Sequence, residues 1–159
     1  IVPVVLHALN WFEKYVKKVS YVLVVYPTAV LLQKENIFSA LNTISTDKNC
    51  DCVIAGTSYP YPIQRALFEN SEGYAQMFEP NQYKSRSQDL QEALHDAGQF
   101  FITKSESVKN GKVLINSNVK IEKLDRSKVI DIDDYEDLNL AELKMRRLKK
   151  ESDDYSWSF

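Results

Sequence analysis

Residues 21–28 read Tyr-Val-Leu-Val-Val-Tyr-Pro-Thr and decide the fold of this 159-residue chain. The first six form a continuous β-rich run, which is typical of a strand buried on both faces and ended by the proline. Residues 3–18 carry apolar side chains at helical spacing, and residues 34–46 do so again after the strand. Residues 52–55 predict a second buried strand. This alternation favours an α/β fold with a Rossmann-like, doubly wound and mostly parallel sheet.

Residues 59–96 interrupt the alternation with three prolines, many polar side chains and little periodicity. The segment is too long for a plain connection inside a compact domain, so we expect an excursion such as a lid or an oligomerisation arm. Strand character returns at residues 99–103, and residues 112–121 predict one or two more short strands. The expected organisation is therefore a core of residues 1–58 and 98–150, an inserted arm of residues 59–97, and a frayed tail of residues 151–159.

The C-terminal region predicts a last buried strand at residues 128–133, which ends in carboxylates, and then a helix. Asp134 is suited to cap that helix, with Asp137 at its third position. Leu138, Ala141, Met145 and Leu148 are expected to form the inner face of the helix.

Composition excludes some function classes. The chain is 44% hydrophobic and 26% charged, with a net charge of -2, so it shows no bulk electrostatic footprint for nucleic acid or an anionic membrane. No apolar run is long enough to cross a bilayer and no leader peptide is visible, so we expect a cytoplasmic protein. Cys50 and Cys52 are then expected to be reduced thiols.

Because the chain starts at Ile1, in a helical pattern, we expect it to begin part-way through a longer protein.

Two polar segments carry the most specific pattern, Arg86-Ser-Gln-Asp-Leu90 and His95-Asp-Ala-Gly-Gln-Phe100. They resemble the block typical of the pseudaminic acid branch of the acylneuraminate cytidylyltransferase family. Three other segments match the family in the same order: residues 26–29, residues 61–66, and residues 130–133 with 137–138. The chain departs from the family where Phe101-Ile102 replaces Tyr-Trp and Val30-Leu31 replaces a Pro-Phe-like pair. The family's opening strand and its loop rich in Gly, Arg and Lys are also absent.

The resemblance implies a nucleotide-diphospho-sugar transferase type of fold, with a dimerisation arm and without its N-terminal part. It also implies transfer of CMP from CTP to the anomeric hydroxyl of a nonulosonic acid, with release of pyrophosphate and a requirement for Mg²⁺. Pseudaminic acid is the favoured sugar, and N-acetylneuraminic or legionaminic acid is the alternative. A second alternative is a non-catalytic fragment that binds sugar or forms dimers but lacks the nucleotide loop.

Asp131 and Asp133 are the candidate metal ligands and catalytic residues. On a strand, side chains two apart point to one face, and a pair of carboxylates there suits Mg²⁺, which fills its shell with substrate phosphates. The alternative is that these carboxylates only cap the last helix. Asp134 and Asp137 are interpreted as helix-start residues in either case.

Arg86 is the candidate clamp for the sugar carboxylate, because a guanidinium binds a carboxylate in a bidentate, orienting manner. The resemblance implies polar sugar contacts from Gln64 and Arg65, although Arg65 could equally form a surface or subunit-interface ion pair. It further implies that the arm crosses to a second subunit of a homodimer and helps to build that subunit's sugar pocket.

The remaining candidates are expected to form hydrogen bonds with the hydroxyl and acetamido groups of the sugar, or to contact a metal-bound phosphate. His95 as a general base is a further possibility, since its normal pKa lies near neutrality. For Tyr26 the alternative is burial in the core. These substrate-binding candidates are Gln88, Asp89, His95, Asp96, Tyr26 and Thr28.

Overall fold

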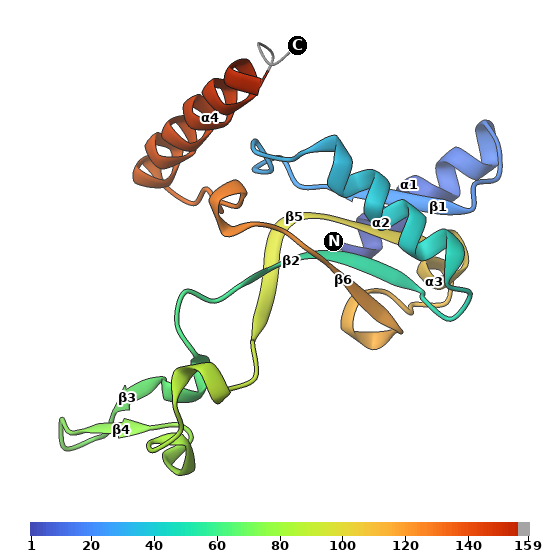
Figure 1. Ribbon diagram of the computed structural model, residues 1–159. Helices are drawn as coiled ribbons and strands as arrows, with labels where there is room; N and C mark the ends of the chain where they lie inside the picture. Colours follow the sequence, from blue (N-terminus) through green and yellow to red (C-terminus); the bar gives the residue numbers. More distant parts are fainter. Residues whose placement is uncertain (156–159) are drawn as a thin grey trace.

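The structure is a computed structural model that describes residues 1–155 (Figure 1). Its helices are α1 (Val2–Tyr15), α2 (Lys34–Thr46), α3 (Ser105–Lys109) and α4 (Tyr135–Tyr155). Its strands are β1 (Tyr21–Val25), β2 (Cys52–Ser58), β3 (Leu67–Glu69), β4 (Ala75–Met77), β5 (Leu94–Lys104) and β6 (Val119–Lys123). Short 3₁₀ turns include η1 (Ile63–Arg65), η3 (Ser87–Asp89) and η5 (Arg126–Lys128).

The main sheet has the strand order β1-β5-β2-β6. The predicted α/β class is confirmed, and β1, β2 and β6 run in one direction. The expectation of a mostly parallel sheet needs one correction, because β5 lies between β1 and β2 and pairs antiparallel with both. The cause is the arm: the chain leaves the sheet at the end of β2 and re-enters it from the same end. β2 and β5 are thus the two sides of a wide hairpin, which helix–strand alternation did not reveal.

Helices cover both faces of this sheet. On one face, Ala40 and Ile44 of α2 pack against Phe100 and Ile102 of β5. On the other face, the side chains of α1 pack against Phe101 and other residues of the sheet. Successive side chains of a strand point to opposite faces, so the apolar run of β5 serves both layers. The doubly wound arrangement follows from this alternation.

The two cysteines lie in this core as free, buried thiols. Burial raises the pKa of the Cys52 thiol to about 11. Because the thiolate is the reactive form, Cys52 is expected to be chemically inert at neutral pH. The prediction of unpaired cysteines is confirmed.

The predicted strand at residues 128–133 is wrong. After η5 the chain is irregular up to the start of α4. Ile130 is buried and packs with Leu31 and with Ala141 of α4, so the apolar residues of this segment are covered by a helix and not by a neighbouring strand. The alternation of burial nevertheless persists, with Asp131 and Asp133 both exposed.

The predicted start of α4 is confirmed. Asp134 Oδ1 accepts hydrogen bonds from the backbone N–H groups of Glu136 (2.8 Å) and Asp137 (3.0 Å). Asp137 Oδ2 in return accepts from the N–H groups of Asp134 (3.4 Å) and Asp133 (3.1 Å), which completes a reciprocal cap. The helix continues to Tyr155. The rest of the expected tail, residues 156–159, lies outside the described residues.

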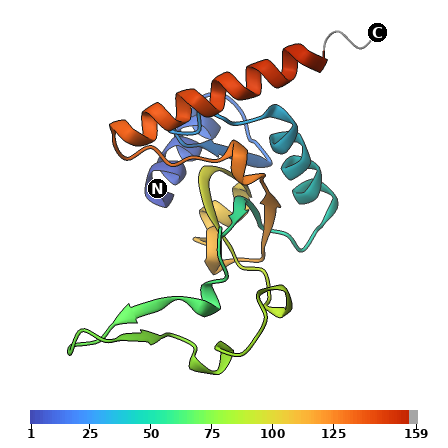
Figure 2. The same ribbon diagram turned by 60° about the vertical axis from the view of Figure 1, so that its left-hand side comes forward.

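The inserted arm projects away from the sheet (Figure 2). β3 and β4 form a two-stranded hairpin within it, and no residue from 59 to 93 is buried. Large side chains on the arm are open to solvent, including Tyr61 (80% exposed), Tyr74 (67%) and Tyr83 (74%). Within residues 1–155, none of the helices combines the length and the apolar character that a membrane crossing requires.

Candidate functional site

The centre of the candidate site is a sharp turn of the backbone within β5. Asp96 Oδ1 accepts a hydrogen bond from Gly98 N at 2.9 Å, and Gly98 has a φ of +61°. A Cβ atom at Gly98 would lie 3.7 Å from Asp131 Oδ1, so the carboxylate of Asp131 rests directly over this glycine. Residues 96–98 and Asp131, which are more than thirty positions apart in sequence, therefore meet.

Tyr26 joins the same turn from β1. Its backbone N–H donates to Gln99 O at 2.9 Å. Partial burial is the main cause that raises the pKa of the Tyr26 phenol, and the negative charge of Asp96 adds to it. The ring packs against the apolar cluster beneath α1, with its centroid 6.5 Å from that of Phe101. The ring of Tyr26 thus contributes to the core, as one of the two alternatives expected, and its contact with a sugar or a phosphate stays a prediction.

Thr28 follows in the turn after β1, where its carbonyl accepts from Val30 N at 2.8 Å. Parts of three segments that suggested the family therefore converge: Tyr26, residues 96–99 and Asp131. Sequence reasoning missed the part played by Gly98, although the Gly-Gln pair inside His95–Phe100 was a visible sign of a special backbone conformation.

Asp133 lies two residues beyond Asp131 and is exposed to solvent as well. The strand that was expected to point both carboxylates to one face is absent from residues 128–133, so their shared orientation stays a prediction. Within residues 1–155, no group of three His, Cys, Asp or Glu side chains lies close enough together to hold a metal ion. Two carboxylates plus substrate oxygens would be a different kind of site, because Mg²⁺ usually retains water and phosphate ligands.

His95 lies between this turn and the base of the arm. Its ring centroid is 4.7 Å from that of Tyr59, and its Nδ1 is 2.8 Å from Asp96 O. Since a carbonyl oxygen only accepts, Nδ1 carries the proton in that bond, and Nε2 of the neutral ring is left as an acceptor. His95 thus links the sheet to the arm.

Arg86 and Asp89 form a bidentate ion pair at η3. Arg86 Nε lies 2.7 Å from Asp89 Oδ2, and Nη2 lies 3.2 Å from Oδ1. The two side chains are 72% and 50% exposed. The guanidinium therefore already binds a carboxylate in the geometry expected of a clamp, and that carboxylate belongs to its own chain. Gln88 stands between them in η3, exposed to solvent.

Gln64 and Arg65 of η1 hold the two ends of the arm together. Gln64 Nε2 donates to Gln91 O at 2.9 Å, while its Oε1 is buried without a hydrogen-bond partner. Arg65 Nη2 donates to Ser85 O, so its described contact is to a backbone carbonyl rather than to a carboxylate. Beside them is a hollow of about 290 Å³, whose lining includes Tyr59, Tyr61, Ser87 and Leu90.

Apart from His95, which lies between them, the candidate residues fall into two groups. The core group is Tyr26, Thr28, Asp96, Gly98, Asp131 and Asp133. The arm group is Gln64, Arg65, Arg86, Gln88 and Asp89. The side-chain hydrogen bonds and ion pairs described for the arm group all end on residues 85–91, and none of them reaches the core group.

The chain is similar to two curated proteins, whereas no protein-family model matches it. The pseudaminic acid cytidylyltransferase of Campylobacter jejuni subsp. jejuni serotype O:2 is 33% identical over 140 residues, which are 88% of this chain and 60% of that protein. The pseudaminic acid cytidylyltransferase of serotype O:23/36 is 35% identical over 124 residues, which are 78% of this chain and 53% of that protein. The chain thus spans between half and two thirds of these relatives. The resemblance inferred from the motifs is confirmed.

Proposed function

Because this chain belongs to the pseudaminic acid cytidylyltransferase family, we propose that its parent protein transfers CMP from CTP to the anomeric hydroxyl of a nonulosonic acid and releases pyrophosphate. Pseudaminic acid is the favoured sugar, since both relatives carry that name. We further propose a homodimeric, cytoplasmic enzyme. The chain covers 60% of the relative with the longer aligned region. These statements therefore concern the whole protein and not the 159 residues alone.

The convergence at Gly98 is the observation that carries this proposal. Family resemblance alone does not place the matched motifs side by side. In the fold, Asp131 lies over Gly98, Gly98 N donates to Asp96, and Tyr26 N donates to Gln99 O. Polar groups from three separated segments therefore meet at one point, as the site of a polar reaction requires.

Asp131 and Asp133 are the residues that would hold Mg²⁺. The bound ion would supply neutralisation of charge at the phosphates and a lower pKa for the attacking sugar hydroxyl. The chain's own part is to keep the two carboxylates exposed to solvent. Asp131 is positioned against the backbone of Gly98, and Asp133 is anchored through its N–H by the cap of α4.

Arg86 would bind the C1 carboxylate of the sugar. Its fork already donates hydrogen bonds to both oxygens of Asp89, so the incoming carboxylate would replace that side chain with the same geometry. Held in this way, the sugar presents its neighbouring hydroxyl in a fixed direction, and orientation of this kind supplies much of an enzymatic rate. Gln64 Oε1, buried and unpaired, would accept a hydrogen bond from a sugar hydroxyl or from the partner subunit.

The separation of the two groups supports the homodimer. Sugar-binding side chains stand on an arm without one buried residue, while the acidic pair stands on the sheet domain. An arm that lies over a second subunit would bring the two groups into one site and would cover its exposed aromatic side chains.

Pyrophosphate release by the full-length protein tests the proposal. CTP, Mg²⁺ and pseudaminic acid should give pyrophosphate and a CMP-sugar, whereas N-acetylneuraminic and legionaminic acid should react at least about tenfold more slowly. Equal rates with all three sugars would remove the substrate assignment. No product with any of them would favour the non-catalytic alternative, as would a parent reading frame without a Gly/Arg/Lys-rich segment before Ile1.

A further inference from the structure

The segment that carries Asp131 has no regular structure to fix its position. Residues 129–134 lie between η5 and α4 and belong to neither a helix nor a strand. The position of a side chain on such a segment depends on the contacts that the segment makes with its surroundings. Groups that hold a metal ligand in place influence how tightly the metal binds. The contacts of residues 126–131 therefore bear directly on the candidate metal site.

Gln99 holds this segment from the sheet. Its Nε2 donates a hydrogen bond to Lys128 O at 2.9 Å, three residues before Asp131. Gln99 is 1% exposed, so its carboxamide lies in the protein interior, where a polar group is costly unless it is hydrogen-bonded. The strand is bulged here, because a single residue of β2 stands opposite residues 97–100 of β5. Bulges redirect side chains, and this one directs the carboxamide to the segment before α4.

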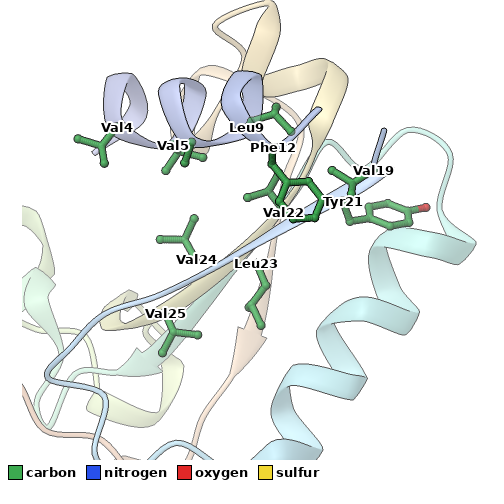
Figure 3. Close-up of a pocket in the computed structure, with 11 residues that line it drawn as sticks. Val4, Val5, Leu9, Phe12, Val19, Tyr21, Val22, Leu23, Val24 and Val25 are labelled. Atoms are coloured by element: carbon green, nitrogen blue, oxygen red, sulfur yellow. The ribbon is translucent and has the colours of Figure 1, made fainter. Parts of the chain in front are cut away.

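The backbone of Gln99 is fixed at the same time. Its carbonyl accepts a hydrogen bond from Tyr26 N at 2.9 Å, and Tyr26 follows directly on β1. Figure 3 shows Val24 of β1 directed toward α1, where it packs in the apolar cluster, so β1 offers a fixed point of attachment. The residue before Gln99 is Gly98, against which Asp131 rests. Gln99 thus joins the packed core to the segment that carries the candidate metal ligand.

Lys144 holds the same segment from α4. Its Nζ donates to Val129 O at 2.6 Å and to Arg126 O at 3.2 Å. Partial burial is the main cause that lowers the pKa of the Lys144 ammonium, and the positive charge of Arg126 adds to it. An ammonium that is partly withdrawn from water needs other acceptors, and the two backbone carbonyls supply them. Side chains of β5 and α4 together therefore bind the carbonyls of residues 126, 128 and 129.

We propose that Gln99 and Lys144 are positioning residues for Asp131: through these carbonyls they hold the segment so that the carboxylate lies over the bulge of β5. This inference deepens the proposed function, because it rests on Asp131 as a ligand of Mg²⁺. Neither side chain is assigned a contact with the metal or the substrates. The competing view is that both contacts only stabilise the fold, in which case their loss would lower stability without changing the affinity for the metal.

Manganese binding to the full-length protein tests the proposal without a measurement of activity. Mn²⁺ replaces Mg²⁺ because free Mn²⁺ can be followed by EPR in a titration. Gln99→Met nearly keeps the size of the side chain but removes the donor to Lys128, and Lys144→Met removes the donor to Arg126 and Val129. Each variant should raise the Kd for Mn²⁺ by about 10-fold or more, as expected when a metal ligand loses a group that orients it.

Two matched controls separate positioning from stability. Thr103→Val removes a buried hydrogen bond near the other end of β5, from Thr103 Oγ1 to Asp51 O at 3.2 Å. Lys150→Met changes an exposed lysine of α4. Both controls should leave the Kd within about twofold, although Thr103→Val should lower the urea midpoint about as much as Gln99→Met does.

The titrations decide on each residue separately. An unchanged Kd for Gln99→Met or for Lys144→Met, beside a clear loss of affinity in Asp131→Asn, would overturn the role of that residue and leave the proposed metal site standing. Equal rises for Gln99→Met and Thr103→Val would overturn the role of Gln99, because any loosening of the sheet would then weaken the site. If Asp131→Asn bound Mn²⁺ as tightly as the unmodified protein, the proposed metal site would be wrong and this inference with it. If Gln99→Met did not fold, Lys144→Met would carry the test.

Discussion

The core group and the arm group place their polar side chains by different physical means. In the core, Asp131 rests on a glycine with positive φ, and backbone hydrogen bonds tie Tyr26 to β5. On the arm, Arg86 is exposed and held only by Asp89 of the same turn. The difference is that the core side chains are held by contacts between distant segments, whereas Arg86 is held by a contact within one turn.

The largest effect should come from the core. In the full-length enzyme, Asp131→Asn removes one of the two proposed metal-binding charges and should lower kcat by about 1000-fold or more. The free energy of unfolding should change by less than about 0.5 kcal/mol, because Asp131 is exposed. Initial rates of pyrophosphate release and a urea titration measure the two quantities.

Asp134→Asn is the matched control for this variant. Asparagine caps a helix about as well as aspartate, so both activity and stability should stay close to those of the unchanged protein. If Asp131→Asn retained most of its activity, or if the two variants lost activity equally, the carboxylates would be only helix-start residues.

The second effect belongs to the arm. Arg86→Lys keeps the charge but removes the planar fork, so the KM for the sugar should rise by about 10- to 100-fold, while the KM for CTP stays the same. Lys84→Ala, an exposed change two positions away, should alter neither constant. A rise in the KM for CTP, or no change for the sugar, would remove Arg86 from the sugar site.

A third prediction compares two glycines, one from each region. Gly98→Ala and Gly73→Ala both place a side chain at positive φ, +61° and +85°. For Gly98 the free energy of unfolding should fall by about 1–2 kcal/mol, because its strand lies in the core. For Gly73 in the β3–β4 loop the fall should be smaller, since the hairpin can open locally without unfolding the sheet. Equal losses in a urea titration would show that the arm and the core unfold as one unit.

The smallest effect is expected for the ion pair on the arm. Asp89→Asn should change the free energy of unfolding by less than about 0.5 kcal/mol, because exposed pairs contribute little. A urea titration at low and at high salt measures it. A loss above about 1 kcal/mol would mean that the pair organises the arm before the sugar arrives.

Local pattern predicted much of the core correctly. The bounds of α2 agree with the prediction at both ends, and β1 differs by one residue, because each segment has a clear apolar period. The cap of α4 by Asp134 also follows from local chemistry. The antiparallel entry of β5 could not be predicted in this way, since it depends on where the long arm returns to the sheet.

The sequence indicated which residues to consider for the site, but not how they are arranged in space. The alternation of apolar and polar residues predicted a strand that contains Ile130 and Ile132. In the structure these residues pack instead with α4 and with Leu31, which is 99 positions from Ile130 in the sequence. No sequence pattern gives the approach of Asp131 to Gly98, because it depends on how the segment before α4 lies against β5. The Arg86–Asp89 pair is local and yet was missed as a pair, because both residues were assigned to the sugar.

Mixing two inactive variants tests most directly whether the core of one subunit works with the arm of another. Full-length Asp131→Asn and Arg86→Ala should each show little activity alone. After exchange of subunits, half of the dimers should be mixed and carry one intact site of two, so pyrophosphate release should recover to about a quarter of the unmodified rate. A mixture that is no more active than the sum of its separate components would contradict an active site built from two subunits.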